Sequence, residues 1–129
     1  MAWARNGARP YVGVVTVDDH ELFRRAAREV IEATDGFELL GEAGSGAEAI
    51  ALTREVDPDL VLLDVRMPGM DGFETARRLR AARPAAVVVL ISSDDVPGPM
   101  CDACGAAAFL PKKDFCQAAL RELWAAHGG

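Results

Sequence analysis

The chain has 129 residues and a net charge of −6, and half of its residues are hydrophobic while 26% are charged. This length is typical of one domain, and this composition is typical of a folded protein rather than a disordered one. No apolar run reaches the roughly 18 residues of a membrane-spanning helix, and the acidic balance disfavours direct binding of nucleic acid. The N-terminus lacks the apolar stretch of a signal peptide, so we expect a cytoplasmic location without membrane association.

Strand-like and helix-like segments alternate along the chain after a flexible leader over residues 1–10. Short apolar, β-rich runs predict strands, and apolar residues that recur every three to four positions predict helices. In chain order the segments are strand Tyr11–Val17, helix Asp19–Ala33, strand Phe37–Ala43, a helix after Ser45 to about Glu55, strand Leu60–Leu63, helix Phe73–Ala82, strand Val87–Ile91, a short helix within Val96–Gly105, strand Ala107–Leu110, and a last helix to about Ala126. Five such repeats predict an α/β domain over residues 11–126, with a parallel sheet covered by helices on both faces and a tail at 127–129.

Candidate helix-capping residues stand at the starts of several predicted helices. Ser45 with Glu48, and Asp71 with Glu74, have the spacing of a capping box, in which each side chain bonds a free backbone N–H at the start of a helix. Asp114 is placed to cap the last helix.

Polar side chains gather where the predicted strands end. Asp18 and Asp19 follow the first strand, Asp64 the third and Ser92 the fourth, and Lys112 lies just past the fifth. Because parallel strands share one carboxyl edge, where ligands bind at the reversal of strand order, we expect these groups in one cleft. The second strand ends without such a group, which suits an edge position.

The expected cluster has a definite chemistry. Two carboxylates at ~4 Å repel by about 4 kcal/mol at an effective dielectric of ~20, and a divalent cation relieves that repulsion. Oxygen ligands suit Mg²⁺. A cation, a lysine and a hydroxyl beside a carboxylate form a phosphoryl site, in which the carboxylate can attack phosphorus. Each aspartate alone is a common turn former, so the pattern on one edge carries the prediction.

Four segments carry a family resemblance: VVTVDDHEL, LVLLDVRMPGMDG, VVVLISS and GAAAFLPKK. In order and spacing they resemble the signature segments of response-regulator receiver domains, over residues 11 to about 126, and they are most similar to NarL/LuxR-type regulators. The resemblance implies a flavodoxin-like, doubly wound sheet of strand order 2-1-3-4-5. It also implies a phosphorelay, in which a sensor histidine kinase donates the phosphoryl group. The implied partner is an output domain or a target protein that acts in transcription.

The same resemblance implies a role for each polar residue of the site. Asp64 would accept the phosphoryl group, and Asp19, Asp64 and the backbone carbonyl of Arg66 would bind Mg²⁺, with Asp18 contributing through a bound water. Lys112 would pair with Asp64 in the free state and with the phosphoryl group afterwards. The domain would phosphorylate itself from the donor and lose the group slowly, without turning over as an enzyme.

A switch is implied as well. Ser92 would bond a phosphoryl oxygen and Phe109, where the family more often has Tyr, would turn inward in response. Arg66 and Asp94 lie two residues after Asp64 and Ser92, at positions that tune phosphoryl lifetime in the family. An ion pair between them would shield the site from water.

Departures from the family concern the neighbouring loops. Pro97-Gly98-Pro99 disfavours a helix start before Met100, so the fourth helix should be short, and this affects how a switch is transmitted. Lys113 stands where the family often has a cis proline, and the geometry of that bond is left open. Gly72 indicates a positive φ or a close backbone approach.

The remaining chemistry-bearing residues favour structural roles. Three cysteines are too few for a disulfide scaffold. We interpret Cys101 and Cys104 as small buried side chains, with a redox switch or a zinc site that recruits Cys116 and His127 as alternatives. His20 is expected to be exposed at a helix start, with metal binding as the minor alternative.

Two other functions stay open at this point. A phosphatase of the haloacid-dehalogenase type needs an Asp-x-Asp pair, whereas Asp18 and Asp19 are adjacent and Asp64 is followed by Val65 and Arg66. A pseudo-receiver, which serves as a protein-interaction module, would lack the acceptor or the lysine. The sequence does not separate a stand-alone receiver from the receiver half of a DNA-binding regulator, and it leaves homodimer formation open.

Overall fold

The protein, described here by a computed structural model over residues 10–128, is built around one parallel sheet of five strands. The strands are β1 (Val12–Val17), β2 (Phe37–Ala43), β3 (Leu60–Asp64), β4 (Val87–Ser92) and β5 (Ala108–Pro111). Their order in the sheet is β2-β1-β3-β4-β5, with every neighbouring pair parallel. The predicted fold class, the strand order and the edge position of β2 are therefore confirmed. Most of the predicted leader lies outside the described residues.

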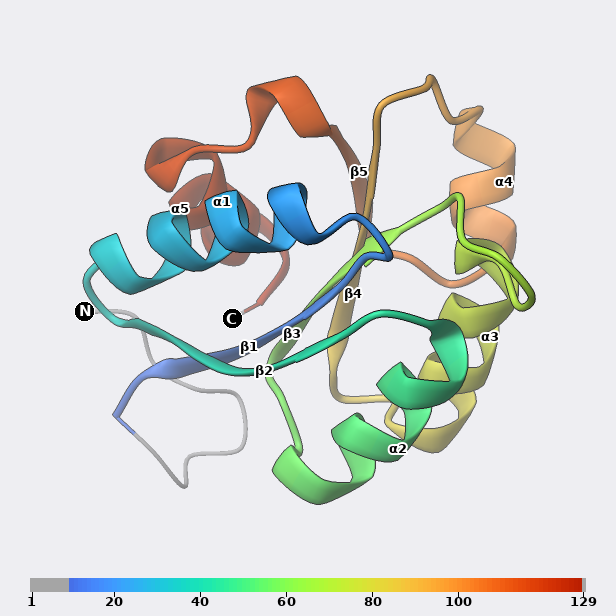
Figure 1. The fold of residues 1–129 in the computed structure, drawn as a ribbon, viewed down its shortest axis with the longest axis horizontal. Coiled ribbons are helices and arrows are strands. Elements are labelled where there is room, and N and C mark those ends of the chain that lie inside the picture. Colours follow the sequence, from blue (N-terminus) through green and yellow to red (C-terminus); the bar gives the residue numbers. More distant parts are fainter. Residues whose placement is uncertain (1–9, 129) are drawn as a thin grey trace.

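Helices cover both faces of the sheet (Figure 1). They are α1 (Glu21–Ala33), α2 (Gly46–Val56), α3 (Gly72–Ala82), α4 (Gly98–Ala103) and α5 (Gln117–His127), with a 3-10 turn η1 (Lys112–Asp114) before the last. The last helix includes His127, which the sequence pattern assigns to the tail. None of the helices in residues 10–128 is long and apolar enough to cross a membrane.

The strands are apolar on both faces because each face packs against helices. In β3, Val61 and Leu63 point into the core under α2, α3 and α4, while Leu60 and Leu62 point into the core under α1 and α5. Alternation along a strand sends neighbouring side chains to opposite faces, so both cores need apolar residues. All five residues of β3 are buried, including Asp64 at its end.

Two of the three predicted helix caps are present. The Ser45 hydroxyl accepts a hydrogen bond from the backbone N–H of Glu48 (3.2 Å), and the Asp71 carboxylate accepts one from that of Glu74 (2.9 Å). The cap predicted at Asp114 is wrong, because this residue lies in the turn η1 and α5 begins only after Cys116.

The fourth helix is short, as predicted, with six residues. It nevertheless begins at Gly98, two residues before the predicted limit at Met100. The reason is that Pro99 lies in the first turn, where a backbone N–H has no partner within the helix and the fixed φ of proline suits the helix.

Candidate functional site

The register of the sheet places the polar residues that follow β1 and end β3 next to each other. Val17 of β1 pairs with Leu63 of β3, so Asp18 and Asp64, which follow them, emerge side by side. These two strands are the neighbours between which the strand order reverses, the place where open α/β sheets bind ligands. The predicted meeting of these side chains at one edge is therefore present.

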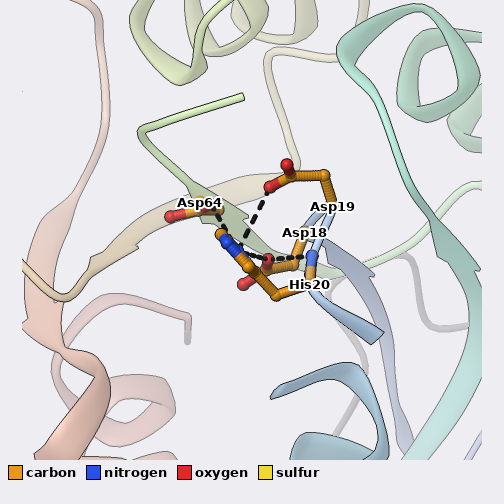
Figure 2. Close-up of side chains that lie close together, drawn as sticks. All are labelled: Asp18, Asp19, His20 and Asp64. Carbon is orange, nitrogen blue, oxygen red and sulfur yellow. Dashed lines mark hydrogen bonds and ion pairs between the residues drawn. The ribbon is translucent and has the colours of Figure 1, made fainter. Parts of the chain in front are cut away.

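Three carboxylates and one imidazole form a compact cluster at this edge. One donor atom from each of Asp18, Asp19, His20 and Asp64 lies within 4.8 Å of every other, and Figure 2 shows the His20 ring facing the carboxylates. His20 Nδ1 is 3.1 Å from Asp18 Oδ1, 3.3 Å from Asp19 Oδ1 and 3.9 Å from Asp64 Oδ2. The ring is 64% exposed, as expected, but its nitrogen belongs to the cluster.

Lys112 supplies the positive charge of the cluster. Its Nζ atom lies 2.6 Å from Asp18 Oδ2 and 3.6 Å from Asp64 Oδ1, and only 13% of the side chain is exposed. The predicted pairing with Asp64 is present, yet the shorter contact is to Asp18. The ammonium also lies 4.7 Å from the centre of the Phe23 ring, and Phe23 packs at 6.1 Å against Phe115. The ammonium thus lies over one aromatic ring of α1, and that ring is backed by Phe115.

The buried carboxylate of Asp64 is only partly compensated by its neighbours. Its Oδ2 atom is buried and accepts no hydrogen bond from any described residue. Burial, followed by the charge of Asp18, raises the pKa of Asp64 to about 6, against the opposing effects of Lys112 and of the backbone N–H of Arg66. A buried oxygen without a partner beside other carboxylates fits a hard divalent cation, which would supply the missing positive charge.

An ion pair spans the mouth of the site. Arg66 Nε lies 2.6 Å from Asp94 Oδ2, with 78% and 53% of the two side chains exposed. The backbone N–H of Asp94 donates to the hydroxyl of buried Ser92 (3.1 Å), which ties the loop after β4 to the site. The predicted Arg66–Asp94 pair is confirmed, whereas its effect on phosphoryl lifetime stays a prediction.

Gly72 allows the loop after β3 to fold back onto the strand. A Cβ atom there would lie 2.3 Å from the carbonyl oxygen of Asp64 and 2.6 Å from Cα of Val65. The backbone N–H of Gly72 donates to the carbonyl of Val65 (2.8 Å). The close approach predicted for Gly72 is confirmed, and a positive φ is found instead at Gly69 (77°).

With this geometry established, comparison with known proteins identifies the family. The family model of the response regulator receiver domain matches residues 14–123. The chain belongs to the response-regulator receiver family. Receivers are signalling domains that take up a phosphoryl group and thereby regulate an output.

Individual relatives agree with this assignment. The receiver is 38% identical over 104 residues to the response regulator GacA of Pseudomonas viridiflava (78% of this chain, 48% of GacA). It is 42% identical over 103 residues to the probable transcriptional regulatory protein NarL of Mycobacterium tuberculosis (78% and 48%). The signal receiver domain of the putative NarL of that organism has a TM-score of 0.82 at 37% identity (94% and 100%). The chain thus spans about half the length of the curated relatives it matches.

The proposed switch residues of the receiver lie in two neighbouring strands, Ser92 at the end of β4 and Phe109 within β5. Phe109 is half-buried and packs against the core under α2, α3 and α4. The loops after β3 and β4, together with residues of α3 and α4, line a groove of about 580 Å³ that includes Arg66, Phe73, Ser92 and Met100. The structure holds one arrangement of these side chains, so the inward turn of Phe109 stays a prediction.

Two of the three cysteines are buried, as the interpretation of Cys101 and Cys104 requires, and Cys116 is exposed. Cys101 and Cys104 are buried free thiols, and burial raises the pKa of Cys101 above its ordinary value, which disfavours the reactive thiolate. Among residues 10–128, the cluster at Asp18 is the one group of His, Cys, Asp and Glu with metal-ligand spacing. A zinc site formed with Cys116 and His127 is therefore absent from this part of the chain.

The bond before Lys113 is trans, because residues 10–128 contain no cis peptide bond.

Proposed function

We propose that Asp64 accepts a phosphoryl group from the phosphohistidine of a sensor histidine kinase in a Mg²⁺-dependent reaction. The observation that carries this proposal is the buried Asp64 carboxylate, with one oxygen unpartnered and with Lys112 and two further carboxylates beside it. A carboxylate oxygen of Asp64 forms a bond to phosphorus while the phosphorus–nitrogen bond breaks. The product is an acyl phosphate on Asp64, and the donor histidine is released without the group.

The other residues of the site would balance the negative charges of the carboxylates and of the phosphoryl group. The carboxylates of Asp18, Asp19 and Asp64 and the backbone carbonyl of Arg66 would hold the cation, Asp18 through a bound water. When bound, Mg²⁺ supplies positive charge against the carboxylates and the phosphoryl oxygens. Lys112, which already lies between Asp18 and Asp64, is placed to hold a phosphoryl oxygen once Asp64 is modified.

The negative charge of the phosphoryl group would change the conformation of the receiver. Ser92 would bond a phosphoryl oxygen and Phe109 would turn inward, which shifts a two-state equilibrium at the surface near α4 and β5. The acyl phosphate would then be hydrolysed slowly by the domain itself. We place this activity in the cytoplasm, within residues 11–126, with an output domain or target protein in transcription as partner.

Phosphorylation by a small donor tests the proposal. Incubated with phosphoramidate and Mg²⁺, the protein should gain one phosphoryl group by intact mass, and it should gain none with a chelator or in the Asp64→Asn variant. Asp71→Asn is the matched control, because exposed Asp71 caps α3 and Asn caps equally well. Failure of the unaltered protein to gain the group would instead support an interaction module of the same fold.

The mouth of the site should control how long the phosphoryl group persists. Arg66→Ala removes the ion pair with Asp94 and opens Asp64 to water, so the acyl phosphate should be lost several-fold faster once the donor is removed. Asp94→Ala should have the same effect, because it removes the other partner. Arg78→Ala, which alters an exposed arginine of α3, is the control. An unchanged decay of intact mass in Arg66→Ala would count against this role.

A further inference from the structure

His20 gives the cation site a donor that magnesium does not need. Its Nδ1 atom faces three carboxylate oxygens at 3.1, 3.3 and 3.9 Å, while most of the ring is open to solvent. Mg²⁺ prefers oxygen ligands and retains its waters, whereas imidazole nitrogen suits later divalent transition metals such as Co²⁺, Ni²⁺ and Zn²⁺. The question is therefore whether this nitrogen can reach an ion held by the carboxylates.

The spacing of the donor atoms fits binding of one ion by His20 Nδ1 and the carboxylates together. Ligands about 2.0–2.2 Å from an ion lie roughly 3.0–3.6 Å from one another when they are neighbours around it. The separations from His20 Nδ1 to Asp18 and Asp19 already fall in this range, and the separation to Asp64 is only slightly longer. Asp64 Oδ2, which belongs to the same cluster, is buried and has no hydrogen-bond partner among the described residues.

Lys112 and His20 contact different oxygens of Asp18. Lys112 occupies the other oxygen of Asp18, Oδ2, so the Oδ1 atom that faces His20 is not taken by the ammonium. The backbone N–H of His20 also donates to that Oδ1 atom (2.8 Å), which fixes the start of α1 beside the cluster. The imidazole itself lies within hydrogen-bond distance of the same oxygen, with Nδ1 3.1 Å from Asp18 Oδ1.

We propose that His20 Nδ1 is a ligand for divalent transition metals in this site, which gives the site a preference for such ions over Mg²⁺. The inference rests on the proposed function, because it concerns the same carboxylates. When Mg²⁺ is bound, the imidazole stays outside the ligand set. When a later transition metal is bound, the imidazole joins it and occupies a position that would otherwise be open.

Titrations with Co²⁺ and with Mg²⁺ test this inference in three proteins. They are the unaltered chain, His20→Gln and His127→Gln, the last altering the other of the two histidines. His20→Gln should lower the affinity for Co²⁺ roughly tenfold or more and leave the affinity for Mg²⁺ unchanged, which also shows that the variant is folded. The Co²⁺-loaded protein should show one strongly shifted imidazole N–H proton resonance, lost in His20→Gln and kept in His127→Gln.

Each opposite result has its own meaning. Equal Co²⁺ affinity in the unaltered chain and His20→Gln would overturn the inference and leave the proposed function standing. A shifted resonance lost in His127→Gln, or a sulfur-to-cobalt charge-transfer band, would place the ion elsewhere and overturn it as well. Absence of binding by both ions would overturn the cation site itself, and the phosphoramidate experiment then judges the proposed function separately.

Discussion

Replacing Asp64 by Asn is expected to raise the free energy of unfolding at pH 7 by up to about 3 kcal/mol when no divalent cation is present. The pKa of Asp64 rises from 3.8 to about 6 on folding, chiefly because the group is buried and secondly because Asp18 is close. A raised pKa means that the folded protein binds this proton more tightly than the unfolded chain does. The resulting stabilisation is fully present below pH 3.8 and is lost as the pH rises through about 6.

Denaturant unfolding in the presence of a chelator measures this effect. The unaltered protein should lose stability relative to Asp64→Asn between about pH 4 and pH 7, and added Mg²⁺ should recover the loss only in the unaltered protein. Asp71→Asn should show no such divergence, because Asp71 is exposed. A difference between the unaltered protein and Asp64→Asn that stays constant over this pH range would contradict the burial of an ionised Asp64.

Replacing Lys112 by Met is expected to lower the free energy of unfolding by about 3 kcal/mol at pH 7, because it leaves two buried carboxylates without their cation. Asp18 and Asp64 both depend on the ammonium, at 2.6 and 3.6 Å. Methionine keeps an unbranched chain over the Phe23 ring, so the loss reports charge more than packing. Phosphorylation by phosphoramidate should slow as well.

The neighbouring lysine provides the control. Lys113 is exposed, so Lys113→Met should change stability by less than about 0.5 kcal/mol. Combining Lys112→Met with Asp64→Asn should restore part of the lost stability, since one of the two uncompensated carboxylates is then removed. Equal losses for the two lysine variants would show that Lys112 does not neutralise the buried cluster.

The position of the site was predictable because it follows from the backbone. Apolar strands buried on both faces fix the sheet, and parallel register then carries Asp18 and Asp64 to one edge whatever their side chains do. The capping pairs at Ser45 and Asp71 were predictable for a related reason, since they are local and need no tertiary contact.

The details that escaped prediction depend on tertiary packing. The cap expected at Asp114 is absent because Phe115 is extended and packs on Phe23, which delays the start of α5. The orientation of His20 Nδ1 toward the carboxylates depends on a side-chain rotamer, which the spacing of residues in the sequence does not reveal. The position of His20 directly after Asp18 and Asp19 is nevertheless a usable signal. The hydrogen bond from the Arg24 side chain in α1 to the backbone carbonyl of Asp18, just after β1, likewise had no sequence signature.

Mapping the phosphorylated residue tests the site most directly. After treatment with phosphoramidate and Mg²⁺, reduction with borohydride converts an aspartyl phosphate into homoserine, which peptide mass spectrometry locates. We predict homoserine at position 64 alone, and none when the cation is removed. Homoserine at position 18, 19 or 71, or its absence from a fully folded protein, would contradict the assignment of Asp64 as the phosphoacceptor.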